Sequence, residues 1–349
     1  MANTHSEGEA ALQAPRPARI KDVAARAGVS QSLVSRLLNN DTNLTIRADT
    51  RQAVLDAVRE LDYVPDSTAT ALRKSRTNAI GLVLEHVTSP MFTEMVHGAQ
   101  RAAADLGCVL LLIDADDVQN GSQLFREMIR ARRVDGLLLQ GGYGSGDELL
   151  KQYASLVPSV IVNSAGTELA AGVRLEDDLA AQVATQHLID SGHQDLVFVS
   201  GPPSVASDVR ARGFTTALER AGIAVSSTSI LAGGWEAQEG FDAVQASLSR
   251  GQRPTGYVVA NSGGALGVLS ALYQAGIRVP DDASVIGVHD PWFAPYLNPA
   301  LSTVALPLFE LGRRSVEQLM ARVSGGKPED LIITDPPPRL VIRQSTRSL

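Results

Sequence analysis

Residues 20–39 read IKDVAARAGVSQSLVSRLLN, and their apolar positions have the spacing of two short helices separated by a turn. Apolar side chains recur at helical spacing on both sides of that turn, namely Ile20, Val23 and Ala24 before it and Val34, Leu37 and Leu38 after it. Gly28 supplies the backbone freedom that a tight turn needs, and Ser30 stands where a side-chain oxygen caps the next helix. The stretch therefore predicts a helix-turn-helix.

The outward face of the second predicted helix is polar. It carries Gln31, Ser32, Ser35 and Arg36. In a helix-turn-helix the second helix enters the major groove of DNA, with its N-terminal residues at the base edges. An ordinary helical hairpin has the same spacing, so the pattern favours DNA binding but leaves a purely structural pair of helices open.

Charge is distributed unevenly along the 349 residues. The whole chain has a net charge of −7, with 44% hydrophobic and 20% charged residues, a composition typical of globular proteins. Residues 19–76 hold 10 Lys and Arg against 7 Asp and Glu, whereas residues 77–349 hold 20 against 29. A cationic N-terminal part on an acidic body permits binding of a polyanion by that part alone.

The cysteine count and the hydropathy exclude several classes of protein. One Cys excludes an intrachain disulfide framework and a multi-cysteine metal site. No apolar run reaches the roughly 18 to 20 residues that a membrane helix needs. The N-terminal residues also lack the hydrophobic stretch of a signal peptide. We therefore expect a cytoplasmic protein with no membrane partner.

From residue 79 onward, short apolar strands alternate with helical segments. The predicted strands are 79–84, 109–113, 135–140, 159–163, 196–200, 257–260 and 285–288, and the predicted helices are 90–106, 123–131, 147–155, 210–221, 237–249 and 264–275. Buried parallel strands that alternate with helices indicate βαβ units covered on both faces. So many units predict two α/β lobes, with a break near residues 165–178. Ligands of such sheets bind beyond the carboxyl ends of the strands.

The sequence contains no recognisable catalytic constellation. The glycine-rich run 142–146 lacks dinucleotide-binding spacing, and neither a Walker A run nor a GxSxG elbow occurs. His187 and His193 have no HExxH context and are expected to be structural. Cys108 begins an apolar strand, where packing is its expected role. The sequence thus predicts no enzymatic activity, no cofactor and no metal site.

Four stretches run almost without interruption from residue 20 to residue 84: IKDVAARAGVS, VSRLLNN, TRQAVLDAVRELDYVP and ATALRKSRTNAIGLVL. Together with HLIDSGH, VFVSGP, VRARGF and GIRVPDDASVIGV, they resemble the LacI/GalR family of bacterial transcriptional regulators. The resemblance implies a small all-α helix-turn-helix headpiece and a two-lobed α/β core like that of periplasmic binding proteins, with parallel sheets flanked by helices. It divides the chain into a flexible tail (1–18), a DNA-binding headpiece (19–65), a hinge helix and linker (66–76), and a core for effector binding and dimerisation (77–349).

The resemblance assigns DNA contacts to the headpiece and the hinge. Gln31 and Ser32 match the main base-reading pair of the family, and the geometry of Arg36 suits guanine. Leu72 falls where the family inserts a leucine into the minor groove, and Ala69 occupies a small position close to that groove. Phosphate contacts are implied for three residues that would equally well be helix caps, namely Ser30, Asn39 and Thr50.

The resemblance also assigns an effector site between the two lobes. Arg210 matches the family's effector-binding arginine, which suits vicinal hydroxyls or a carboxylate; a salt bridge between the lobes is the alternative. Phe92 and Trp235 match aromatic positions that stack on ligand rings. The remaining expected contacts are Asn163, Asn261, Ser262, His289 and Asp290.

Two positions of the effector site depart from the family pattern. His289 stands where many sugar-binding members have Asp, and Ser262 stands where Asp is also common. With these carboxylates absent, the site is expected to accept an acidic or phosphorylated sugar better than a neutral-sugar pocket does, although a neutral sugar stays possible. We expect His289 to titrate near pH 6.5, so that anion binding strengthens as the pH falls through that value.

The sequence therefore predicts a homodimeric DNA-binding transcriptional regulator, expected to be a repressor, with a sugar or sugar derivative as its effector. Two-fold symmetry lets two headpieces read a palindromic operator. One alternative is a soluble small-molecule binding protein without DNA function, which a gel-shift assay separates from a regulator. The other is a doubly wound enzyme, which turnover on a substrate panel would support.

Overall fold

The computed structural model describes residues 16, 18–38, 41, 43–63, 76–85, 87, 89, 92–120, 122–141, 152–327 and 329–349. The chain divides into two compact units, residues 1–75, which include the headpiece (19–65), and residues 76–349, which include the core (77–349). Most of the predicted tail and hinge lie outside the described residues, and so do three predicted DNA contacts, Asn39, Ala69 and Leu72.

The headpiece contains the helices α1 (Ile20–Ala27), α2 (Gln31–Leu38) and α3 (Ala48–Glu60). They enclose a small apolar core of Val23, Ala24, Val34, Leu37, Val54, Ala57 and Tyr63. The turn after α1 places Gly28 at a φ of 66°, a left-handed conformation that glycine adopts readily. Ser30 Oγ then accepts a hydrogen bond from the backbone N–H of Leu33 at 3.2 Å, which provides the predicted cap of α2. The predicted helix-turn-helix is confirmed.

The core contains two six-stranded sheets, one in each lobe. The spatial order of the first sheet is β11 (Leu331–Ile333), β5 (Ala171–Leu175), β4 (Ser159–Val162), β3 (Gly136–Gln140), β1 (Ala79–Leu84) and β2 (Val109–Asp114). All its neighbouring strands are parallel. Because β1 lies between β2 and β3, the strand order reverses there, and the carboxyl end of β1 is a topological switch point.

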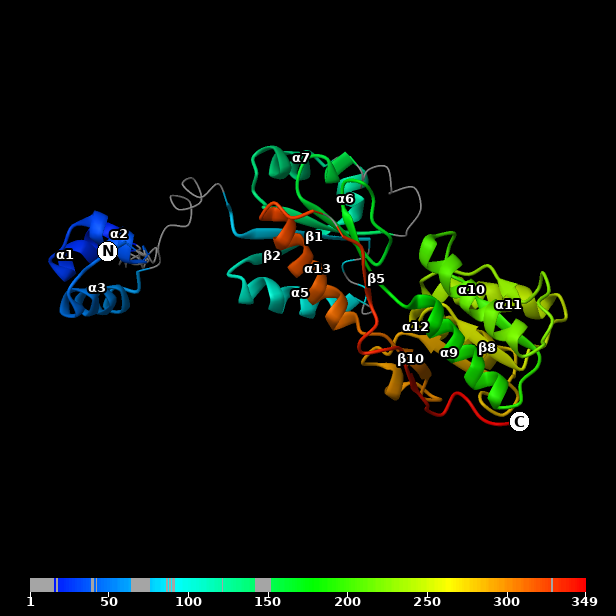
Figure 1. The fold of residues 1–349 in the computed structure, drawn as a ribbon. Coiled ribbons are helices and arrows are strands. Elements are labelled where there is room, and N and C mark those ends of the chain that lie inside the picture. The colour runs from blue at the N-terminus through cyan, green and yellow to red at the C-terminus, as the bar shows by residue number, and fades with distance from the viewer. Residues whose placement is uncertain are drawn as a thin grey trace, which may run out of the picture. The chain divides into compact units, whose positions relative to one another are not determined.

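Helices cover both faces of the first sheet (Figure 1). They are α5 (Thr93–Asp105) and α13 (Leu308–Val323) on one face, and α6 (Ala115–Gln119) and α7 (Gln123–Arg130) on the other. Successive residues of β1 alternate between these faces, so that Leu82 packs with α5 and α13, whereas Val83 packs with α6 and α7. The two apolar layers explain why this strand reads as a continuous hydrophobic run.

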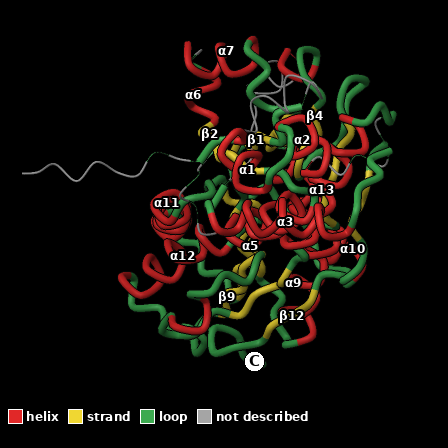
Figure 2. The backbone as a smooth tube through the Cα atoms, turned by 90° about the vertical axis from the view of Figure 1, so that its left-hand side faces the viewer, coloured by secondary structure: helices red, strands yellow, loops and turns green. Residues whose placement is uncertain are grey.

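The second sheet has the same winding. Its spatial order is β12 (Arg339–Val341), β10 (Ser302–Ala305), β9 (Ser284–Val288), β8 (Gly256–Val259), β6 (Leu196–Val199) and β7 (Ile230–Leu231), and only β12 is antiparallel to its neighbour. The flanking helices are α9 (Asp177–Asp190), α10 (Val205–Arg220), α11 (Ala237–Ser249) and α12 (Ser262–Gln274). Phe198 packs with α9 and α10, and Val199 packs with α11 and α12. The pair α11 and α12 and the pair α9 and α10 lie on opposite sides of the strands (Figure 2). The carboxyl end of β6 is the switch point of this sheet.

Within the described residues, the chain passes between the lobes at three points. These are the connections from β5 to α9, from β10 to α13 and from β11 to β12. The predicted break at 165–178 includes the first of them, but β5 still belongs to the first sheet. Late segments return to the first lobe because α13 packs beside α5 and β11 pairs with β5.

Strand β2 differs from the buried strand that the sequence predicts. It lies at the edge of its sheet and pairs with β1. Val109, Leu111 and Leu112 are 61%, 38% and 45% exposed. Hydrophobic periodicity does not distinguish an edge strand from a central one, because the difference depends on what lies beside the strand.

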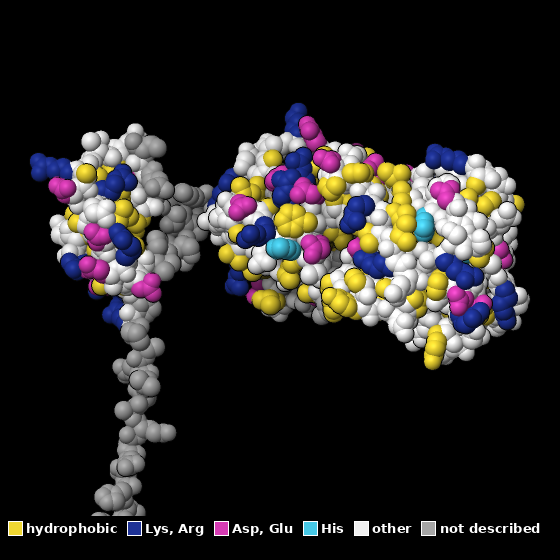
Figure 3. Space-filling model, turned by 90° about the horizontal axis from the view of Figure 1, so that it is seen from below, with side chains coloured by type: hydrophobic (Ala, Val, Ile, Leu, Met, Phe, Trp, Pro, Cys, Tyr) yellow, Lys and Arg dark blue, Asp and Glu magenta, His cyan; other side chains and the backbone are white. Residues whose placement is uncertain are grey.

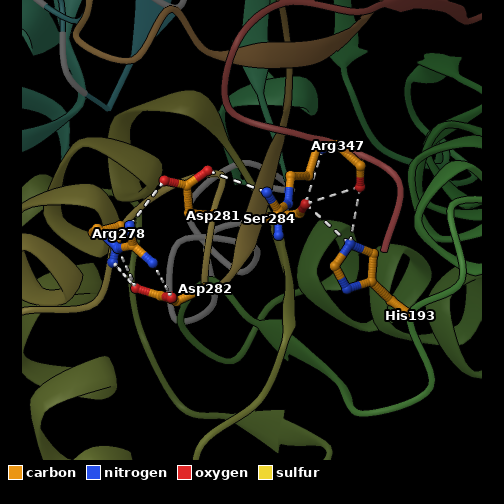
Figure 4. A network of polar contacts seen from close by, with 6 residues as sticks. All are labelled: His193, Arg278, Asp281, Asp282, Ser284 and Arg347. Carbon is orange, nitrogen blue, oxygen red and sulfur yellow. Dashed lines mark hydrogen bonds and ion pairs between the residues drawn. The ribbon is translucent and has the colours of Figure 1, made fainter.

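The last residues of the chain are held against the second sheet by His193 (Figure 4). Its Nε2 lies 3.0 Å from Ser284 Oγ and 3.3 Å from the carbonyl oxygen of Arg347, and its Nδ1 lies 3.1 Å from Thr255 Oγ1. Burial lowers the pKa of this imidazole below 6.5. His193 thus has the structural role that the sequence predicts.

Close contact between backbones joins α5 and α13 in the first lobe. A Cβ atom at Gly312 would lie 1.9 Å from the carbonyl oxygen of Met95, and a Cβ atom at Gly98 would lie 1.9 Å from that of Phe309. Each helix therefore uses a glycine where the partner backbone approaches it.

We expect Gly312→Ala to lower the free energy of unfolding by about 1–3 kcal/mol, because the added methyl forces the two helices apart. Urea unfolding of the full chain measures the change. Arg101→Ala, on the exposed side of α5, is the control and should stay within about 0.5 kcal/mol of the wild type. Equal stability of Gly312→Ala and the wild type would contradict the close packing.

Candidate functional site

Residues that follow the strands of both lobes line one pocket of the core. They come after β1, β4, β6, β7, β8 and β9 and from the first turns of α5 and α13. The lining residues are Ser89, Phe92, Met95, Asn163, Ala206, Arg210, Trp235, Glu236, Asn261, His289, Leu308 and Leu311. The pocket thus lies beyond the carboxyl ends of the strands and includes both switch points, where ligands of doubly wound sheets bind.

Two polar residues of this pocket have a strained backbone. Asn163 directly follows β4 with a φ of 62°, and His289 directly follows β9 with a φ of 72°. A residue with a Cβ atom adopts this left-handed conformation at a cost of about 1–3 kcal/mol, and such residues concentrate at binding sites. One strained residue comes from each lobe.

Arg210 lines the pocket with a buried side chain and is paired with Asp177. Its Nε and Nη2 donate to Asp177 Oδ1 at 2.8 and 2.6 Å, and its Nη1 donates to the carbonyl oxygen of Ala260 at 2.6 Å. The side chains of the pair are only 2% and 6% exposed. Asp177 begins α9 in the same lobe as Arg210, so this pair is not a salt bridge between the lobes.

Arg210 also affects which nitrogen of His289 accepts a hydrogen bond and whether the ring is protonated. Its Nη2 lies 3.1 Å from His289 Nε2. Because a guanidinium has no acceptor, Nε2 must accept this hydrogen bond. Burial, and then the charge of Arg210, holds the pKa of His289 well below 6.5. The prediction that His289 titrates near pH 6.5 and attracts an anion as the pH falls is therefore wrong.

Asn261 supports the wall of the pocket. Its Oδ1 accepts from the backbone N–H of Gly264 at 2.7 Å as the cap of α12, and its Nδ2 donates to the carbonyl oxygen of Trp235 at 2.9 Å. The Arg210 guanidinium lies 5.6 Å from the centre of the Trp235 ring, within the range of a cation–π interaction. Trp235 is thus fixed through its backbone and contacted on its ring.

Phe92 lines the pocket at the start of α5, while Asp290 has partners elsewhere. Asp290 Oδ1 accepts from Thr303 Oγ1 at 2.8 Å and pairs with Arg343 at 2.8 Å, and Asp290 is not among the lining residues. An effector contact by Asp290 stays a prediction that this geometry does not support. Ser262 is fully buried, and its hydroxyl donates to the carbonyl oxygens of Val288, the last residue of β9, and of His289, the residue after it.

The sequence does not single out Asp177, Leu308 or Leu311. Asp177 follows Glu176 and precedes Asp178, and acidic residues at a helix start commonly stabilise the helix dipole. Its burial against Arg210 depends on two helices meeting, which the local pattern does not encode. The two leucines come from α13, which reaches the pocket only because the chain returns to the first lobe.

In the headpiece, the N-terminal end of α2 presents polar side chains to solvent. Gln31, Ser32 and Arg36 are exposed. Arg36 Nε donates to Asp41 Oδ2 at 2.7 Å, with the arginine side chain 45% exposed. Gln31 and Ser32 therefore lie on the face opposite to the headpiece core.

The predicted phosphate contacts of the headpiece occupy helix starts. Ser30 is exposed and caps α2, and Thr50 is half-buried in the first turn of α3. Asn39, Ala69 and Leu72 lie outside the described residues.

Other types of functional site find no support in the described part of the chain. It contains no cluster of three His, Cys, Asp or Glu side chains that could hold a metal ion. None of its helices has the length and hydropathy to cross a membrane. Cys108 is buried, and burial raises the pKa of its thiol, which disfavours the reactive thiolate.

Two family models match the chain. Residues 19–66 match the bacterial regulatory proteins of the lacI family, and residues 185–346 match a periplasmic binding protein-like domain. The HTH-type transcriptional repressor PurR of Photobacterium profundum is 34% identical over 337 residues, which cover 95% of this chain and 99% of that protein. The chain belongs to the LacI family of bacterial regulatory proteins.

Two solved structures show the same fold across most of their length. The Lac repressor dimer bound to operator and the anti-inducer ONPF has 28% sequence identity and a TM-score of 0.79, covering 95% of this chain and 100% of that one. The transcriptional regulator CelR–cellobiose complex has 27% identity and a TM-score of 0.69, covering 94% and 99%. This LacI-family chain is thus a DNA-binding transcriptional regulator with a small-molecule effector, and not an enzyme.

Removing the counter-charge of Arg210 tests the buried pair. We expect Asp177→Ala to lower the free energy of unfolding by about 3–5 kcal/mol, because the guanidinium stays buried without its carboxylate. The double variant Asp177→Leu with Arg210→Met removes both charges and should recover most of this loss. Chemical denaturation of the three proteins gives the comparison.

Arg278→Ala, which breaks an exposed ion pair with Asp282 (Figure 4), is the control and should change stability little. If Asp177→Ala behaved like this control, the carboxylate would not be needed to stabilise Arg210.

Proposed function

We propose that the chain is a homodimeric repressor of transcription whose effector is a sugar or sugar derivative. Two headpieces (19–65), each preceded by an N-terminal tail (1–18) and joined to the core by a hinge segment (66–76), bind a palindromic operator. Effector bound in the core (77–349) controls the affinity for DNA. Because operator DNA lies in the cytoplasm, the repressor works there.

The observation that carries this proposal is the separation of two faces on α2. Val34 and Leu37 are buried in the headpiece core, while Gln31 and Ser32 are exposed at the N-terminal end of the helix. Base edges meet this end of the second helix in helix-turn-helix proteins. Gln31 suits adenine through a bidentate contact, and Ser32 can pair with several bases.

The remaining DNA contacts extend from α2 in both directions along the chain. Arg36 suits guanine. If its guanidinium contacted a base, it would exchange its hydrogen bond to the Asp41 carboxylate for hydrogen bonds to the polar base edge. The excess of basic residues over 19–76 favours the approach of DNA. As the family resemblance implies, we assign phosphate contacts to Ser30, Asn39 and Thr50. We assign the minor-groove wedge to Leu72 and the small position close to that groove to Ala69.

Exposed apolar side chains on both lobes supply surfaces for a second copy of the chain. In the first lobe they lie on β2, where Val109 is 61% exposed, and in the second lobe Tyr296 is 80% exposed. Hydrophobic side chains also reach the surface in patches on the face of the core seen in Figure 3. Patches of exposed apolar side chains can mark interaction sites, and the Lac repressor structure that shares this fold is a dimer.

The pocket provides the contacts that an effector needs. Phe92 and Trp235 offer ring faces, and Asn163, Arg210 and His289 offer polar atoms. Asn261 positions Trp235 through its backbone carbonyl. Aromatic faces combined with a few polar groups suit a sugar ring, and the cellobiose complex of CelR shares this fold.

Base reading by Gln31 is the direct test of the DNA-binding function. We expect Gln31→Ala to change the preferred base at one position of each half-site and to weaken binding of the selected operator by about 1–3 kcal/mol. Selection from random DNA, followed by fluorescence anisotropy, measures both effects for the full chain.

Gln52→Ala is the matched control, because Gln52 is an exposed glutamine that donates to Asp56 on α3. It should select the wild-type motif. The same motif for Gln31→Ala would remove the base-reading role, and no selected motif for the wild type would contradict DNA recognition.

Charges placed on the exposed apolar surfaces test the dimer. We expect the double variant Val109→Glu with Tyr296→Glu to shift the protein from dimer to monomer, because carboxylates lose hydration when the surfaces meet. Analytical ultracentrifugation measures the mass, and operator affinity should fall because one headpiece is left to bind.

The control is Leu124→Glu with Leu156→Glu, at leucines that are 68% and 61% exposed elsewhere in the first lobe. This variant should remain a dimer. An unchanged dimer in both variants would place the subunit interface on other surfaces.

A further inference from the structure

The buried side-chain atoms of the pocket include one from each lobe that has no hydrogen-bond partner within the described residues. They are Asn163 Oδ1, in the first lobe, and His289 Nδ1, in the second. Burying a polar atom without a partner costs about 1–3 kcal/mol, and both residues also have a left-handed backbone. Within the described part of the chain, Asn163 and His289 therefore each present an unsatisfied polar atom at the site where a ligand would bind.

The chemical character of the free His289 atom follows from its other nitrogen. Nε2 accepts from Arg210 Nη2 at 3.1 Å. In a neutral imidazole the nitrogen that does not accept carries the proton, so Nδ1 is an N–H donor. Asn163 Oδ1 is a carbonyl oxygen and accepts. The pocket thus offers one buried donor and one buried acceptor.

The charges around the pocket are already compensated. Arg210 is the basic residue among the described lining residues, and four of its five N–H groups donate to Asp177, Ala260 and His289. The other charged lining residue is Glu236, which is exposed at the start of α11. An anion entering the pocket would meet no unpaired cation and would lose its hydration.

We propose that the effector is an uncharged molecule that places a hydrogen-bond acceptor against His289 Nδ1–H and a donor against Asn163 Oδ1. Hydroxyl groups supply both, and a carbonyl oxygen supplies the first. The inference rests on the proposed effector role of this pocket and selects among effector classes. It replaces the acidic or phosphorylated sugar that the sequence favours with a neutral, hydroxylated one.

Matched probes test the charge of the ligand. Isothermal titration calorimetry of the full chain compares D-glucose with D-glucuronate and D-glucose 6-phosphate, and D-ribose with D-ribose 5-phosphate. We expect the uncharged member of a pair to bind at least about tenfold more tightly. Equal or tighter binding of a carboxylate or phosphate overturns the proposal.

Variants of Asn163 test the acceptor. Asn163→Gly removes Oδ1 while it relieves the left-handed strain, so the protein should fold with equal or higher stability but bind the uncharged probe about tenfold more weakly. Asn163→Asp keeps an oxygen acceptor and should bind within about threefold of the wild type. Full affinity of Asn163→Gly would show that Oδ1 does not contact the ligand.

The histidine tautomer tests the donor without any ligand. Nitrogen-15 NMR of histidine-labelled full chain, with His289→Gln assigning the signal and His97→Gln as the exposed control, should show a neutral Nδ1–H tautomer from pH 7.5 to 6. Among the described residues, Arg210 on α10 is the charged group bonded to this ring, and Arg210 is in turn paired with Asp177 on α9, while the carboxylate of the adjacent Asp290 is bonded to Thr303 and Arg343. An Nε2–H tautomer or a protonated ring at pH 6.5 overturns the proposal.

An operator-binding assay with the same probes separates this inference from the proposed function. A probe that binds the pocket but leaves operator affinity unchanged would contradict the effector role while supporting the pocket chemistry. A sugar phosphate that binds and changes operator affinity would support the effector role and overturn the neutral-ligand inference.

Discussion

The buried ion pair between Arg210 and Asp177 is the interaction on which the effector pocket depends. A guanidinium taken out of water costs several kcal/mol unless its donors are satisfied. Here its partners come from the start of α9, from the residue after β8 and from the residue after β9. One side chain of α10 thus joins the ends of three other elements, and it also lies beside the Trp235 ring.

The pair affects binding through His289, because Arg210 donates to Nε2 and leaves Nδ1 as the nitrogen that carries the proton. Asn163 follows a strand of the first lobe and His289 follows a strand of the second. Within the residues that the structure describes, the acceptor of Asn163 and the donor of His289 have no partner. A ligand changes an equilibrium only through different affinities for its two states. A molecule bonded to both residues binds more tightly to the arrangement that brings the lobes together. This difference in affinity between two arrangements couples binding to the rest of the chain.

Local patterns in the sequence predict much of this fold and some of the site. The spacing of Val23, Val34 and Leu37 predicts the helix-turn-helix, and apolar runs predict most of the central strands. Arg210 is found because it matches a recognisable family position, and Trp235 because it matches an aromatic position of the family after a strand end. The exposure of Val109 and the return of α13 to the first lobe could not be predicted in this way, since both depend on contacts between segments far apart in the sequence.

The charge state of a site is a property of its neighbours rather than of its residue types. Taken singly, Arg210 and His289 indicate a cationic pocket, and the absence of two carboxylates strengthens that interpretation. The buried surroundings reverse that interpretation. A carboxylate at 2.6 Å compensates the guanidinium, and burial, followed by the charge of Arg210, lowers the pKa of the His289 imidazole. Resemblance to a family locates the residues of a pocket, but the partners buried behind them decide which atoms donate, which accept and what charge the ligand can carry.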